Sequence, residues 1–189
     1  DKLLTLDDTT GLEWLDLTQT DALSFNDVSA QLGPGGNFES FRFATLSEVN
    51  AFLAAFGLPP TNCTPGNCPG DPSLNAAVTQ FHNLVGLTFS DVNCTRSAGY
   101  TGTDNPSDSS EAIVKAVDIC VGAALIQELN VSKSSNPGGF AGSFLVREAE
   151  TETVTICHKP GTRARKTLVI PIEDLAGHLR HGDTRGPCQ

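Results

Sequence analysis

The sequence has no methionine, one tryptophan and one tyrosine, and charged residues make up only 18% of the chain. It has no apolar run of about 18 residues, so it predicts no membrane span. A chain without Met that starts at Asp1 is typical of a secreted protein after removal of its signal peptide. A piece trimmed from a longer chain would have the same features. The low charge and the many glycines favour a loop-rich extracellular β or α+β protein over a helical bundle.

The usual signatures of catalysis are also missing. The chain contains no G-x-S-x-G nucleophile motif and no H-E-x-x-H metalloprotease motif. The glycine-rich stretch at 33–36 follows an expected helix rather than a strand, which does not fit a phosphate-binding loop. No pair of carboxylates is singled out for glycoside hydrolysis. We therefore expect a protein that is not an enzyme.

Charge is distributed unevenly along the chain. Residues 1–150 contain 6 Lys/Arg and 18 Asp/Glu, giving −12, whereas residues 151–189 contain 6 Lys/Arg and 4 Asp/Glu, giving +2. The strongly acidic part argues against nucleic acid as a partner. The basic tail is suited to contact the acidic part of the same molecule or of a neighbour. The simpler alternative is that the charge serves solubility.

The chain has six cysteines, an even number that indicates disulfides when a protein matures outside the cytoplasm. Their spacing along the chain favours pairing between sequential neighbours. The expected bonds are Cys63–Cys68, Cys94–Cys120 and Cys157–Cys188.

Hydrophobic periodicity predicts an α+β domain over residues 1–148. Ser24 is expected to cap a helix that ends at Gly33, and Thr45 with Glu48 forms a capping box for a second helix ending at Gly57. A third helix is expected at 73–84. Residues 96–111 are polar and rich in turn residues, so we expect a surface loop. Strands are expected at 12–17, 41–43, 112–120, 124–131 and 140–147.

Three islands of residues 1–148 resemble a known group of proteins. They are TGLEWLDL at 10–17, FRFAT at 41–45 followed by Glu48 and Val49, and FLVR at 144–147. They resemble secreted bacterial proteins of the PEP-CTERM type and the collagen-like-adhesin C-terminal domain. That resemblance implies a C-type-lectin-like fold, in which the first and last strands pair. The chain lacks the Pro-Glu-Pro signal, hydrophobic helix and basic end of PEP-CTERM proteins, so membrane-linked sorting is not implied.

Residues 149–189 form a separate unit in the sequence, a small disulfide-tied β-hairpin and helix. Strands are expected at 153–157 and 167–170, followed by a helix that starts at Pro171 and ends at Gly182. The pattern CHKPG, GHLRHGD and GPC resembles a small C-terminal module of secreted bacterial proteins, which is not tied to a particular activity.

This tail concentrates groups that can bind metal. Neutral imidazoles with a carboxylate form a good first shell for Zn²⁺ or Cu²⁺. The candidate ligands are His158, His178, His181, Asp174 and Asp183. Cys157 and Cys188 could also act as thiolate ligands, although an oxidising compartment favours their disulfide. The alternative is that the histidines only form hydrogen bonds with the backbone.

Two weaker kinds of site are also present. Acidic stretches at Asp7-Asp8 and at Asp104, Asp108 and Glu111 could hold Ca²⁺, but neither follows the EF-hand spacing, which favours solvated turns. Asn93 and Asn130 lie in glycosylation sequons, each with an acidic residue two positions earlier that resembles the extended bacterial sequon.

Taken together, these features favour a secreted structural protein at the cell surface, a subunit that assembles with copies of itself into a fibre or matrix. One alternative is an adhesive module that binds glycans, for which only Trp14 and Tyr100 offer polar-tipped aromatic rings. The other alternative is a metal-binding tail domain.

Overall fold

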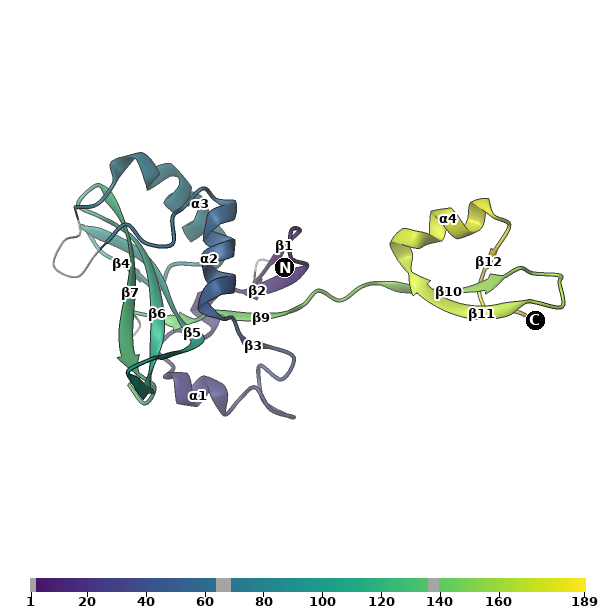
Figure 1. Ribbon diagram of the computed structural model, residues 1–189, viewed down its shortest axis with the longest axis horizontal. Coiled ribbons are helices and arrows are strands. Elements are labelled where there is room, and N and C mark those ends of the chain that lie inside the picture. Colours follow the sequence, from purple (N-terminus) through teal and green to yellow (C-terminus); the bar gives the residue numbers. More distant parts are fainter. Residues whose placement is uncertain (1–2, 64–68, 136–139) are drawn as a thin grey trace. The chain divides into compact units, whose positions relative to one another are not determined.

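The computed structural model describes residues 3–63, 69–135 and 140–189 (Figure 1). The chain divides into two compact units, Asp1–Glu148, which we call the body, and Ala149–Gln189, which we call the module. Both units combine helices and antiparallel strands, so the expected α+β class is confirmed. Among the described residues, no helix has the length and apolar character needed to cross a bilayer.

The first sheet of the body joins the two ends of its chain. Its strand order is β1 (Leu4–Asp7), β2 (Leu12–Leu15), β9 (Leu145–Glu148) and β3 (Arg42–Phe43). β2 and β9 are antiparallel, with Trp14 opposite Val146. The second strand of the chain therefore pairs with the last strand of the body.

The second sheet has the order β4 (Phe89–Ser90), β5 (Cys94–Asn105), β6 (Asp108–Cys120) and β7 (Ala123–Ser132), and β8 (Gly142–Ser143) runs parallel to β5. The prediction of a surface loop at 96–111 is wrong, because these residues form most of β5 and the start of β6. The outer half of this hairpin is exposed and polar. Backbone hydrogen bonds between β5 and β6 stabilise this half of the hairpin, and such bonds require no apolar pattern in the sequence.

Two helices of the body begin where their caps predict. α1 (Phe25–Ser29) and α2 (Leu46–Ala55) each have a complete capping box, from Ser24 and Thr45. α1 ends four residues before the expected Gly33, because the chain turns back and Phe38 N–H donates to the Gln31 carbonyl. The 3-10 turn η1 (Leu17–Gln19) precedes α1, and η2 (Pro72–Leu74) leads into α3 (Asn75–Val85).

The main core of the body lies between the second sheet and helices α2 and α3. Trp14 stacks on Phe52 with ring centroids 4.3 Å apart, and Phe144 packs edge-on against the same indole. The opposite face of the sheet carries a smaller cluster that includes Tyr100 and Val114. The body therefore holds most of the buried apolar surface of the chain.

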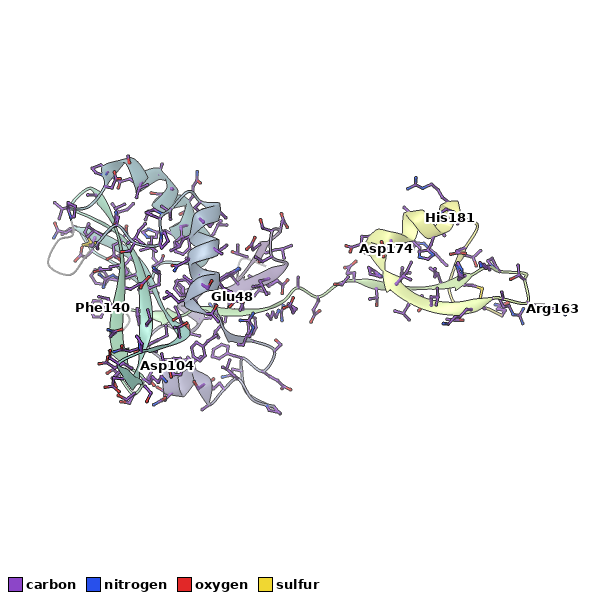
Figure 2. All side chains as sticks on the ribbon, viewed as in Figure 1. Glu48, Asp104, Phe140, Arg163, Asp174 and His181 are labelled. Carbon is purple, nitrogen blue, oxygen red and sulfur yellow. A yellow bond between two sulfur atoms is a disulfide. The ribbon has the colours of Figure 1, made fainter. Side chains whose placement is uncertain are left out.

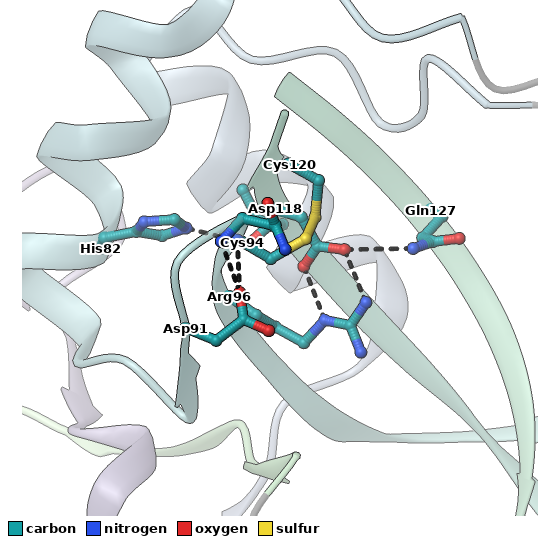
Figure 3. Close-up of a disulfide and its surroundings, with 9 residues drawn as sticks. His82, Asp91, Cys94, Arg96, Asp118, Cys120 and Gln127 are labelled. Carbon is teal, nitrogen blue, oxygen red and sulfur yellow. Dashed lines mark hydrogen bonds and ion pairs between the residues drawn. A yellow bond between two sulfur atoms is a disulfide. The ribbon is translucent and has the colours of Figure 1, made fainter. Parts of the chain in front are cut away.

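A disulfide and a buried ion pair brace the β5–β6 ladder (Figure 3). Cys94 and Cys120 are direct partners across the two strands and form a disulfide, the pairing expected from spacing. On the next pair of the same face, Arg96 donates two hydrogen bonds of 2.8 Å to the buried carboxylate of Asp118. The expected Cys63–Cys68 bond involves Cys68, which lies outside the described residues.

The module is a small three-stranded sheet with one short helix. β10 (Thr153–His158) lies between β11 (Lys166–Pro171) and β12 (Thr184–Arg185). The turn η3 (Ile172–Asp174) leads into α4 (Leu175–Arg180). Its apolar cluster contains three buried side chains, those of Ile156, Ile170 and Leu175. The Cys157–Cys188 disulfide ties the end of the chain to β10.

Candidate metal centre in the C-terminal module

Two imidazoles of the module converge on one carboxylate oxygen. Asp183 Oδ2 lies 2.8 Å from His158 Nδ1 and 2.7 Å from His178 Nδ1. The other oxygen, Oδ1, accepts a 3.0 Å hydrogen bond from the Lys159 backbone N–H. Among the described residues, this is the one group of at least three possible metal ligands, and its ligand atoms lie within 4.8 Å of one another.

Each member of this cluster is placed by a different element. His158 is the last residue of β10, and His178 lies in α4. Gly182, with a positive φ of 90°, lets the chain leave the helix, and Asp183 N–H then donates to the His178 carbonyl. Lys159 also has a positive φ, 51°, which directs its amide toward Asp183.

The electrostatics of the cluster favour an ionised Asp183. The hydrogen bond from His158 holds the pKa of this carboxyl well below its usual range, helped by the Lys159 amide and by His178. Since an ionised carboxylate only accepts hydrogen bonds, both Nδ1 atoms must donate to it. The Asp183 side chain is 2% exposed, whereas the His158 and His178 side chains are 34% and 29% exposed. The carboxylate of the cluster is thus buried, whereas both imidazole rings are partly exposed to solvent.

The remaining predicted ligands lie elsewhere on the module. Asp174 and His181 line a separate shallow cavity of about 350 Å³, together with Gly177 and His178 (Figure 2). His178 therefore belongs to both places, but Asp174 and His181 are not part of the cluster around Asp183. The Cys157–Cys188 disulfide leaves neither sulfur as a thiolate ligand.

The other candidate sites of the sequence are in the body. The Asp7 carboxylate caps its own turn at Thr9 and Thr10, and Asp108 accepts from Ser110. Asp104 forms an ion pair with Lys133. Together with Asp8 and Glu111, these groups form no cluster of possible ligands in the part of the chain that the structure describes.

The two sequons and the remaining histidine can also be placed. Asn93 and Asn130 are both exposed, so each side chain is accessible for modification. His82 is buried in α3, and its Nε2 lies 2.9 Å from the Val117 carbonyl oxygen. Burial lowers the pKa of His82, which fits a neutral packing residue.

Sequence reasoning missed the Lys159 backbone amide, although the turn sequence Lys159-Pro160-Gly161 was a usable signal.

Comparison with protein-family models, with curated proteins and with solved structures finds no match to this chain.

Proposed function

We propose that this protein is an extracellular, non-enzymatic binding protein whose module holds a divalent transition-metal ion, Zn²⁺ or Cu²⁺. The ligands are Nδ1 of His158, Nδ1 of His178 and Oδ2 of Asp183. Because a ligating nitrogen carries no proton, each neutral imidazole holds its proton on Nε2 when the ion is bound, and bonds to the ion replace the two hydrogen bonds to Asp183. The observation that carries the proposal is the convergence of two imidazoles on one carboxylate oxygen.

The donor set and its surroundings suit such an ion. Two nitrogens and one carboxylate oxygen are typical ligands of Zn²⁺, at distances of about 2.0–2.2 Å. The three atoms lie within 4.8 Å of one another, so small side-chain shifts bring them to a common ion. The Lys159 amide holds Oδ1, as the second shell of a metal site commonly holds a ligating carboxylate.

The size of the module supports the same proposal. Its apolar cluster has three buried residues, and domains this small usually need a disulfide or a metal in addition to a core. The cluster joins β10 to α4 and to Asp183, which lies three residues after the end of α4, so an ion there would tie together the same parts of the chain. Ion binding would then also stabilise the fold of the module.

For the body we propose the C-type-lectin-like fold. Two features support this assignment. β2 pairs with β9, and helices α2 and α3 lie between these two strands in the sequence. The two disulfides of the described residues are typical of proteins that mature in an oxidising compartment, which supports secretion. An experimental structure of the body and cell fractionation would test these two points.

The metal proposal is tested by titrating the intact, oxidised protein with Zn²⁺ and with Cu²⁺ in a calorimeter. We expect one ion per chain, and we expect His158→Gln to weaken its affinity at least about tenfold. His181→Gln is the matched control, because His181 lies in the same module outside the cluster, and it should change the affinity less than about threefold. Full affinity in His158→Gln would contradict the assignment, as would no binding by the wild-type protein.

A further inference from the structure

The Lys and Arg side chains of the described part of the body form ion pairs within the body itself. Within residues 3–63, 69–135 and 140–148, every Lys and Arg side chain forms an ion pair with a carboxylate of the body. The pairs are Arg42–Glu48, Arg96–Asp118, Lys115–Glu128, Lys133–Asp104 and Arg147–Glu13. Since the body has far more acidic than basic residues, many of its described carboxylates have no Lys or Arg side chain of the described residues left to pair with.

The module shows the opposite pattern. None of its Lys or Arg side chains forms an ion pair with a carboxylate in the described part of the chain. Asp183, its most buried carboxylate, is occupied by two histidines instead. The module therefore presents unpaired cations to solvent, and the body presents unpaired carboxylates.

Two of these cations share a cavity. A hollow of about 370 Å³ is lined by Arg165 and Arg185, with Thr184, Gln189 and the Cys157–Cys188 disulfide forming other parts of its wall. Arg185 is fixed by β12, where it lies opposite Ile156 of β10. The disulfide holds the end of the chain against the same strand. The cavity is thus built on the most constrained part of the module.

We propose that this Arg165–Arg185 cavity is a docking site for carboxylates on the body of a second copy of this protein. A guanidinium binds a carboxylate through two parallel hydrogen bonds, and two guanidiniums beside one cavity can hold an acidic surface at two points. The body supplies such a surface, because its negative charge is in excess and the Lys and Arg side chains of its described residues are already paired. This inference does not depend on metal binding.

The place of the cavity in the chain favours a second molecule over the same one. In one molecule, only four residues, 149–152, join the body to the start of β10. The cavity lies around Cys157 and Pro160, at the other end of β10, about 13 Å or more along the strand. A neighbouring body can approach that end directly. Such a contact joins unlike surfaces, so it can repeat from copy to copy, into a ring if the rotation between copies closes and into an open chain if it does not.

The test is sedimentation of the full-length oxidised protein over a range of concentrations, at about 0.02 M and about 0.5 M salt. At low salt the weight-average mass should rise above the monomer value of 19.9 kDa with concentration. At high salt it should fall back, because salt screens exposed charges. Arg165→Glu/Arg185→Glu should stay monomeric at both salt concentrations.

The matched control is Arg163→Glu/Arg180→Glu, which makes the same charge change on exposed residues outside the cavity (Figure 2 labels Arg163). It should associate within about threefold of the wild type. Circular dichroism of both variants verifies that the module is intact. A wild-type protein that remains monomeric at low salt would overturn the proposal. Equal association of the two variants would also overturn it.

Discussion

Replacing both Cys157 and Cys188 by Ser should unfold the module while the body stays folded. The disulfide closes a loop with a sequence separation of 31 residues. By the loop-entropy relation, opening such a loop costs the folded state about 3.7 kcal/mol. The three buried apolar side chains of the module contribute about 1.5–3 kcal/mol each before the cost of ordering the chain. Because the cost of ordering the chain offsets much of that gain, the module has little net stability with which to absorb the loss of the cross-link.

Two probes separate the units in one sample. The single tryptophan, Trp14, is 2% exposed in the core of the body, so its fluorescence reports on the body alone. Hydrogen exchange of the β10 and β11 amides, measured by mass spectrometry of peptides, reports on the module. In the variant, exchange in these strands should reach the rate of an unfolded chain, and the Trp14 emission should stay unchanged.

The reciprocal variant is the control. Cys94→Ser/Cys120→Ser opens a loop of similar separation, 26 residues, and should cost about 3.5 kcal/mol in the body. Its effect should appear in the Trp14 signal and leave β10 and β11 protected. Wild-type protection of β10 in the module variant would refute the claim that its core is too small to fold without the cross-link.

Three further results are expected. Asp118→Asn should lower the free energy of unfolding of the body by about 2–4 kcal/mol, because it removes a buried charge that accepts two hydrogen bonds from Arg96. The hydrogen bond from Arg42 lowers the pKa of Glu48 from 4.5 to about 2, so its stabilising effect is complete above pH 4.5 and is lost as the pH falls toward 2; Glu48→Gln should flatten that part of the stability curve. Gly142→Ala should cost more than about 2 kcal/mol, because a Cβ there would lie 2.2 Å from the Leu17 carbonyl oxygen.

Urea titrations followed by Trp14 fluorescence measure all three effects. Asp8→Asn is the control for the loss of a carboxylate, since Asp8 is exposed and should change stability by less than about 0.5 kcal/mol. A loss in Asp118→Asn as small as in Asp8→Asn would contradict the role of the buried pair. An unchanged acid profile in Glu48→Gln, or wild-type stability in Gly142→Ala, would contradict the other two arguments.

Features that depend on neighbouring residues could be predicted from the sequence. Thr45 and Glu48 are three positions apart, so both partners of their capping box are visible in the sequence. The start of α1 at Ser24 was predictable for the same reason. The spacing of the cysteines was sufficient for Cys94–Cys120 and Cys157–Cys188, because each bond links sequential neighbours.

Features that depend on strand pairing could not be predicted in the same way. The outer half of the β5–β6 hairpin has no apolar alternation, so its composition resembles that of a loop. In the module, helical periodicity groups Asp174, His178 and His181. His158, His178 and Asp183 were all among the five candidate ligands, but which three come together depends on His158 at the end of β10, 25 residues from Asp183.

The cysteines of the module bond only to each other, so no covalent bond other than the peptide backbone joins the two units. One cut by a protease in residues 149–152 should therefore release two fragments that separate on a gel without any reductant. The released C-terminal fragment would retain its own cross-link and the residues of its metal and arginine sites. Shedding of one unit by a single cleavage is thus a direct result of where the sulfurs lie.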